Sequence, residues 1–167
     1  MLFRSLFFEY HIHNTDDSIC RITNFSLLCV TVNKSPVIKR LLTGLSIAPP
    51  NDVITLFAPT NAAFTAAGIT ESTIESWDAN LLLNQILRTH IAPGKFSAFD
   101  LQCDSQLSML LKTTTTQCAT ARANNGKAQT GAFNTDDDLP MILTPNNIEA
   151  CNGFIQPISN IIRSIQF

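Results

Sequence analysis

One segment constrains the fold of this chain more than any other, because a strand and a helix meet in it with a defined junction. Val53 to Phe57 is a short run of β-branched and aromatic residues, which is typical of a buried strand. Ala58-Pro59 ends that run. Thr60 then stands where it can cap a helix that begins at Asn61 and closes at Gly68. The segment therefore predicts a strand that passes directly into a helix.

The rest of the chain divides into a half that favours helices and a half that favours strands. Helical spacing of apolar residues occurs between Ile19 and Asn33, and Ser35-Pro36 is a preferred helix start. From Gln106 onward the pattern changes to short strands and turns, with predicted strands at 107–111, 113–118, 141–144, 154–158 and 161–165. Helices followed by strands indicate an α+β fold of one domain, which suits a chain of 167 residues.

Two later segments complete a pattern with the strand–helix junction. They are Leu87-Arg88-Thr89-His90-Ile91-Ala92-Pro93-Gly94 and Ala150-Cys151-Asn152-Gly153-Phe154-Ile155. In this order and at these separations, the three segments resemble the first motif, the central histidine segment and the second motif of a fasciclin-like domain. The resemblance covers residues 19–167 and leaves 1–18 as a poorly anchored N-terminal segment. It implies helices packed on a wedge of two small β-sheets, and an extracellular adhesion module in place of an enzyme.

Composition and charge exclude several other classes. The net charge is −2 and no basic block is present, so nothing indicates nucleic-acid or anionic-membrane binding. The longest apolar run, Phe25 to Val32, is too short to span a bilayer. Met1 to Phe8 does not form a convincing signal peptide, and no lipid-anchor tail follows the domain. We nevertheless expect a secreted or cell-surface protein, present here as a fragment, a single module or an imperfect gene model.

The five cysteines suggest structural disulfides in an oxidising compartment. If Leu110-Leu111 is the turn of a hairpin, residues whose numbers sum to 221 face each other, and Cys103 and Cys118 satisfy that sum. Cys103–Cys151 and Cys118–Cys151 remain as alternatives. The first choice leaves Cys151 as a buried thiol. A second bridge, Cys20–Cys29, is supported by similar cysteines in some fasciclin-like domains and would pin the N-terminal segment to the first helix.

Two glycosylation sequons are compatible with secretion. They are Asn24-Phe25-Ser26 and Asn33-Lys34-Ser35. Pro36 follows the second sequon directly, which disfavours its use.

The family resemblance places candidate partner-binding residues around His90. In the family, a tyrosine-histidine pair flanked by aliphatic residues has been linked to integrin contact, whereas this chain has Thr89-His90. A histidine next to aliphatic residues is more often a buried group that hydrogen-bonds the backbone, and that role is favoured for His90. The candidate contact residues are Ile86, Leu87, Thr89, His90 and Ile91.

Four further residues are predicted to be structural. Thr60 and Asn61 would hold the strand-to-helix turn, and Asn152-Gly153 is a turn dipeptide before a strand. The family commonly has a histidine and an aspartate after this dipeptide, where this chain has Gln156 and Ser159. Pro157 lies between them and predicts an edge or bulged strand.

These observations favour an adhesion or matrix-interaction module that binds a cell-surface receptor, a matrix protein or a glycan, and that needs no metal or other cofactor. The second hypothesis is a secreted small-ligand or carbohydrate-binding protein, which predicts a cavity of several hundred Å³. The third is a thiol hydrolase that pairs Cys29 or Cys151 with His90. Metal binding by His11, His13 and Asp16, or calcium binding by 136–138, is disfavoured because loops do not fix ligands well.

Overall fold

The computed structural model describes residues 13–44, 53–78, 81–118 and 126–165. Its helices are short, and most of them precede the strands in the chain. They are α1 (Thr15–Arg21), the 3-10 turn η1 (Thr23–Phe25), α2 (Ser26–Asn33), α3 (Pro36–Leu42), α4 (Asn61–Ala66), α5 (Glu71–Ser76) and α6 (Leu82–Thr89). The strands are β1 (Ile54–Pro59), β2 (Ile91–Pro93), β3 (Gln106–Ser108), β4 (Thr113–Cys118), β5 (Lys127–Thr130), β6 (Ile148–Ala150) and β7 (Gly153–Ile158).

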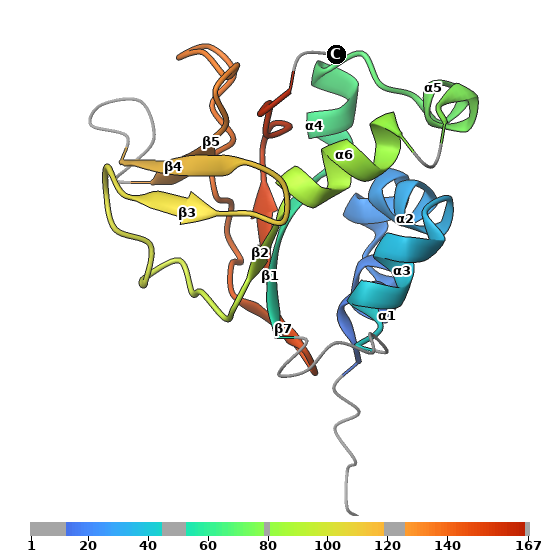
Figure 1. Ribbon diagram of the computed structural model, residues 1–167, viewed down its shortest axis with the longest axis horizontal. Coiled ribbons are helices and arrows are strands. Elements are labelled where there is room, and N and C mark those ends of the chain that lie inside the picture. The colour runs from blue at the N-terminus through green and yellow to red at the C-terminus, as the bar shows by residue number, and fades with distance from the viewer. Residues whose placement is uncertain (1–12, 45–52, 79–80, 119–125, 166–167) are drawn as a thin grey trace, which may run out of the picture.

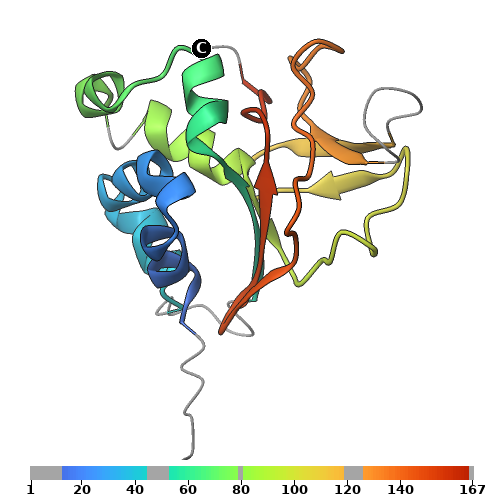
Figure 2. The same ribbon diagram turned by 180° about the vertical axis from the view of Figure 1, so that it is seen from behind.

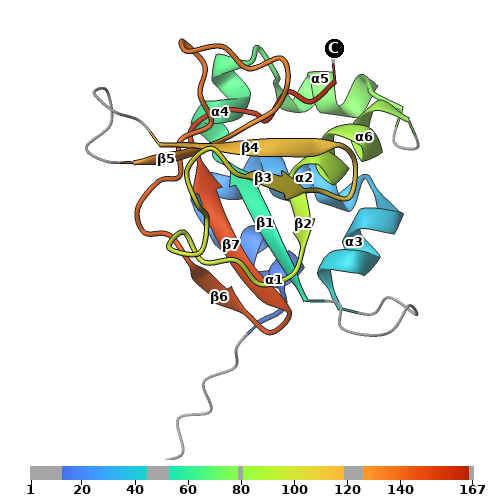
Figure 3. The ribbon, with the colours of Figure 1, turned by 60° about the vertical axis from the view of Figure 1, so that its left-hand side comes forward.

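The strands form two small sheets, as the α+β prediction required. The larger has the order β2-β1-β7-β6, with β1 and β7 parallel and the outer pairs antiparallel. The smaller is antiparallel, with the order β3-β4-β5. In Figure 3 the strands of the smaller sheet cross in front of the steeply inclined strands of the larger one. The wedge of two sheets is confirmed.

The larger sheet lies between two different layers. Helices α1 to α3 cover one face, and the smaller sheet covers the other (Figure 1). Figure 2 shows the same three layers from behind, with β7 in the middle. Each face has its own apolar core, so successive residues of β1 point into different cores. Leu56 packs with the helices, whereas Phe57 packs with the smaller sheet.

Local sequence signals explain where several elements begin. Ser35 Oγ accepts a hydrogen bond from the N–H of Ile38 at 3.3 Å, and Pro36 occupies the first position of α3, as predicted. Thr60 Oγ1 accepts from the N–H of Ala63 at 3.3 Å and caps α4. The register of β3 and β4 pairs Gln106 with Thr115, whose numbers have the sum of 221 that was inferred from a turn at Leu110-Leu111.

The N-terminal region differs from the prediction in two respects. Residues 19–33 are not one helix, because the chain bends at Ile22 and passes through η1 before α2. The anchored part also begins earlier than Ile19. Thr15 is fully buried in α1 and hydrogen-bonds Asn152 through its hydroxyl at 2.8 Å. The boundary at residue 18 was therefore wrong for Thr15–Ser18, because sequence alone did not reveal this distant partner.

The C-terminal strands also differ in part from the prediction. The residues 161–165 form no strand, and 141–144 contribute only the isolated bridges of Met141 and Ile142. Strand β7 is internal instead of lying at an edge. Pro157 is tolerated there because β6 pairs no further than Ile155, so the proline lies beyond that ladder.

Candidate functional site

His90 lies directly after α6 and connects that helix to the C-terminal segment. Its side chain is buried, with 1% of its surface exposed. Nδ1 lies 2.8 Å from the carbonyl oxygen of Ile86, and Nε2 lies 2.9 Å from the N–H of Ile162. Because the Ile162 N–H can only donate, Nε2 accepts and Nδ1 carries the proton that it donates to Ile86. His90 thus joins two backbone segments that are 72 residues apart.

Burial lowers the pKa of His90 from 6.5 to about 4, and the hydrogen bond to the Ile86 carbonyl opposes this shift only in part. The protonated ring would lose its solvation in the apolar interior, and it could no longer accept from Ile162. His90 is therefore neutral near pH 7.

The residues predicted to surround His90 as a contact rim are buried with it. Thr89, Ile91, Leu87 and Ile86 expose 0%, 0%, 2% and 4% of their surfaces. These candidate contact residues are not available to a partner, because α6 turns its apolar side toward the sheet. The structural role of His90, which the sequence favoured, is the one that its contacts support.

Asn61 acts at a greater distance than the predicted strand-to-helix turn. Its Oδ1 accepts from the N–H of Leu27 at 3.0 Å, and its Nδ2 donates to Thr23 O at 3.1 Å and Ser26 Oγ at 2.9 Å. Helix α2 has no side-chain cap of its own from Phe25. Asn61 therefore supplies a cap for α2 from 34 residues away, while Thr60 caps α4 locally.

Asn152 and Gly153 form a second long-range joint. Asn152 Oδ1 accepts from both the N–H and the hydroxyl of Thr15, at 3.0 and 2.8 Å, and Nδ2 donates to the carbonyl of Leu42 at 3.0 Å. Gly153 has φ +147°, and a Cβ there would lie 1.7 Å from the carbonyl oxygen of Ile54. The dipeptide is more than a turn, because it ties α1 and α3 to the start of β1.

Gln156 and Ser159, which replace the family's histidine and aspartate, are also engaged internally. Gln156 is fully buried, and its amide bonds the N–H and the side chain of Asn147 and the carbonyl of Phe96. Ser159 Oγ accepts from the N–H of Met141 at 3.0 Å. Both side chains therefore order loops next to β7.

Both disulfides proposed from sequence are present. The Cα atoms are 5.0 Å apart in Cys20–Cys29 and 5.3 Å apart in Cys103–Cys118. The first spans the bend between α1 and α2, and the second joins the chain before β3 to the end of β4. Cys151 lies in the turn between β6 and β7 and is exposed, so the expectation that it is buried was wrong.

The two sequons differ in their surroundings. Asn24 is exposed in η1. Asn33 is exposed at the end of α2, but its Oδ1 accepts from Lys39 at 2.5 Å and its sequon serine, Ser35, is buried as the cap of α3. Only the first sequon has an asparagine outside such contacts.

The contacts of the candidate hydrolase residues do not fit catalysis. Cys29 is oxidised in a disulfide, and both ring nitrogens of His90 bond the backbone. Among the described residues, no group of three or more His, Cys, Asp or Glu side chains could hold a metal ion. His11 lies outside those residues. In the acidic loop, Asp138 binds the N–H of Thr135 and the guanidinium of Arg163.

Surface hollows formed by the described residues include two of the size expected for ligand binding. One, of about 470 Å³, lies between α3 and α6. The other, of about 330 Å³, lies beside the C-terminal end of α4 and contains Asp138, Asn160 and Arg163. Hollows of this size agree with the second hypothesis, which predicts a cavity of several hundred Å³.

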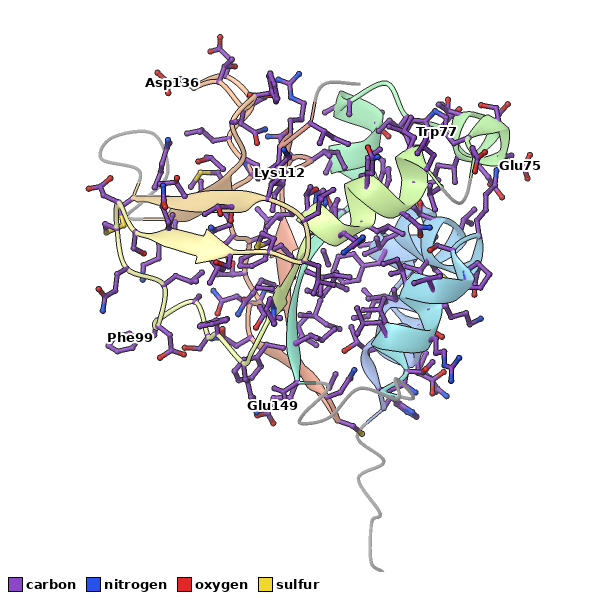
Figure 4. The ribbon with its side chains drawn as sticks, in the orientation of Figure 1. Glu75, Trp77, Phe99, Lys112, Asp136 and Glu149 are labelled. Carbon is purple, nitrogen blue, oxygen red and sulfur yellow. A yellow bond between two sulfur atoms is a disulfide. The ribbon has the colours of Figure 1, made fainter. Side chains whose placement is uncertain are left out.

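The loop between β2 and β3 contains an exposed aromatic residue that sequence analysis missed. Phe99 has 91% of its surface exposed (Figure 4). Lys127 holds the loop by donating from Nζ to the carbonyls of Ala98 at 2.8 Å and of Leu101. An aromatic residue beside Asp100 after Pro93-Gly94 was the only sequence signal, and it does not reveal exposure.

With the fold and these joints established, comparison with known proteins identifies the class. The fasciclin domain profile matches residues 23–164, so the chain belongs to the fasciclin domain family, which is associated with cell adhesion. A search of curated protein sequences gives no match.

A solved FAS1 domain pair from the insect cell adhesion molecule fasciclin I has a similar fold. The TM-score is 0.65 at 13% sequence identity, over 89% of this chain and 50% of that chain. This chain thus spans half the length of the solved chain, and the similarity establishes the fold. No helix among the described segments is long and apolar enough to cross a membrane.

Proposed function

We propose that this chain is an extracellular or cell-surface adhesion module that binds a matrix protein, a receptor or a glycan. The observation that carries the proposal is the fasciclin profile match over residues 23–164 on a matching fold. Two disulfides agree with an oxidising compartment. The exposed Asn24 is the glycosylation site that we expect to be used, and Asn33 is not.

The contact surface is expected to lie outside the His90 segment, because Ile86, Leu87, Thr89, His90 and Ile91 are buried. Exposed apolar side chains mark other surfaces. Val37, Leu81 and Phe99 expose 66%, 63% and 91% of their surfaces. Large exposed apolar side chains are common anchors in protein interfaces.

A cell-attachment assay on the immobilised folded chain tests the proposal. We expect attachment above an albumin-coated surface, and protease or glycosidase treatment of the cells would distinguish a protein from a glycan partner. His90→Ala should lower attachment only as far as it lowers the folded fraction, with exposed Gln117→Ala as control. Folded chain that supports no attachment to any cell type or matrix component would overturn the proposal.

The second candidate is recognition of a small polar ligand or a carbohydrate. The 330 Å³ hollow favours it, because Asp138, Asn160 and Arg163 converge beside the small side chains of Ala66 and Ala67. Together, the side chains of Asp138, Asn160 and Arg163 supply both donors and acceptors for the hydroxyl groups of a ligand.

An NMR titration with a panel of neutral and acidic monosaccharides separates this function from adhesion. Binding predicts saturable shifts at Asn160 and Arg163, which Arg163→Ala abolishes and Lys112→Ala leaves unchanged. The absence of saturable shifts would remove the carbohydrate hypothesis for this hollow.

A further inference from the structure

The loop of residues 97–101 is a rigid projection that presents Phe99 to solvent. Ser97 donates to Asp100 Oδ2 from its N–H at 2.8 Å and from its hydroxyl at 2.7 Å. The N–H of Ala98 donates to Asn147 Oδ1 at 2.7 Å, and Lys127 Nζ binds the loop carbonyls. A loop backbone held by so many hydrogen bonds loses little further freedom on binding.

The hollow between α3 and α6 has the opposite shape and charge. Its lining combines apolar residues with the polar side chains of Asn84, Gln85 and Arg88; the apolar residues are Val37, Ile38, Leu41, Leu81 and Leu110. Arg88 from α6 lies at the same hollow, is exposed, and donates from Nη2 to the carbonyl of Leu110 at 3.3 Å. The guanidinium retains further donors for an acidic group.

The projection and the hollow complement each other in size and in charge. An apolar cavity of about 150 Å³ is enough for benzene, so the 470 Å³ hollow can admit a phenyl ring. Asp100 places a carboxylate next to Phe99, and Arg88 places a cation next to the apolar lining. An aromatic anchor beside a charge pair is typical of an interface centre.

The two features cannot meet within one molecule. Phe99 lies at the left-hand margin of Figure 4, whereas α3 lies at the right-hand side of the same view in Figure 1. The smaller sheet and β1 lie between them. Any contact must therefore join two copies.

We propose that Phe99 and Asp100 of one copy bind the hollow between α3 and α6 of a second copy, with the ring against Val37 and Leu41 and the carboxylate on Arg88. This inference rests on the proposed adhesion function for its biological role and names a second copy of the chain as the partner. Because the projection and the hollow are different surfaces, the contact can repeat from copy to copy into chains or rings, or form twice in a two-fold dimer. One aromatic side chain and one ion pair bury less surface than a stable protein interface does. The association is therefore weak and becomes visible only at high protein concentration.

Sedimentation velocity on the purified chain tests the contact without cells, so its outcome is independent of the attachment assay. The weight-average mass of the wild type should rise with concentration. Phe99→Ala should lower the association constant at least about tenfold, as expected for a central aromatic anchor. Phe133→Ala is the matched control, because Phe133 is another exposed phenylalanine, at 46%, and should leave association unchanged.

A charge exchange provides the sharper test. Asp100→Lys and Arg88→Glu should each abolish self-association, because like charges then meet across the contact. An equimolar mixture of the two variants should associate again, because the projection of each variant then meets a hollow of opposite charge on the other variant. The double variant Asp100→Lys/Arg88→Glu should associate on its own, which a loop merely disordered by Asp100→Lys would prevent. A wild type that stays monomeric, an unaffected Phe99→Ala, or a mixture that does not associate would each overturn the proposal.

Discussion

The two faces of the larger sheet are stabilised by different chemistry. On the helical face, a large apolar core extends from Ile19 to Ile161 and includes residues of every α-helix. On the other face, the apolar cluster is small, and polar side chains fill much of the smaller sheet. Gln129 is fully buried there and bonds the hydroxyls of Thr114 and Thr116 at 2.7 and 2.8 Å.

This difference indicates what each face depends on. Apolar packing is non-directional and tolerates small displacements of the helices, whereas hydrogen bonds between buried polar groups require defined geometry. The smaller sheet should therefore depend more on its disulfide and on its polar contacts. The parallel pairing of β1 and β7, called the seam below, supports both faces of the sheet.

Gly153→Ala should have the largest effect, because it breaks the seam itself. The new Cβ would meet the Ile54 carbonyl, so β1 and β7 must separate. We expect a loss of at least about 4 kcal/mol in the free energy of unfolding, which is in the extreme range for point substitutions. Urea denaturation measures it.

Gly68→Ala is the matched control for that substitution. Gly68 also has positive φ, +71°, but a Cβ there has no atom within 4 Å. Its cost should be limited to about 1–2 kcal/mol from backbone strain. Equal losses of unfolding free energy in the two variants would show that the positive φ of the glycine, and not the close approach of β1 and β7, determines the cost of the substitution.

Stability should fall in acid because of His90. Its pKa is 6.5 when unfolded and about 4 when folded, so the unfolded chain binds a proton first as pH falls. The contribution is fully present above pH 6.5 and is lost as pH falls from there toward 4. The shift corresponds to about 3 kcal/mol.

Denaturation of the wild type and of His90→Ala between pH 7.5 and 4 measures this contribution. The variant should be less stable at pH 7.5, because Ile162 N–H and Ile86 C=O lose their partner. Its stability should also depend less on pH. Parallel pH profiles for the two proteins would contradict the assignment.

Removal of each disulfide compares the two faces directly. The loops contain 9 and 15 residues by sequence separation. Chain entropy alone predicts losses of about 2.6 kcal/mol for Cys20–Cys29 and about 3 kcal/mol for Cys103–Cys118. Each disulfide is removed by a pair of serine substitutions, and stability is measured by denaturation. The difference between the two losses should exceed the difference that chain entropy predicts, because the smaller sheet has less apolar packing. A greater loss for Cys20–Cys29 would reverse the comparison.

Asn61→Ala should have the smallest of these effects. The substitution removes the Asn61 side chain that caps α2 by accepting from the N–H of Leu27. It leaves the apolar core of the helical face in place. A lost cap costs about 1 kcal/mol. Thermal denaturation beside Gln117→Ala measures it, and a loss comparable to that of a disulfide would show that polar joints also dominate the helical face.

Sequence alone determined the features that depend on contacts between near neighbours. The caps of Ser35 and Thr60 and the β3–β4 register follow from residues a few positions apart. The strand predicted at 53–57 is also present, although it continues through Ala58 and Pro59. The α+β order and the family also followed from such local motifs and their spacing. Both disulfides were inferred, one from hairpin register and one from the family.

Tertiary structure decided the roles of the polar side chains and the location of exposed surface. Asn152 finds Thr15 at a separation of 137 residues, and His90 finds Ile162 at a separation of 72. The ammonium of Lys127 holds the Phe99 loop, a role that no local sequence signal indicates. The exposure of Phe99 and Cys151 was likewise not predicted. A buried polar group must find a partner wherever the folded chain brings one, and local propensity carries no information about that position.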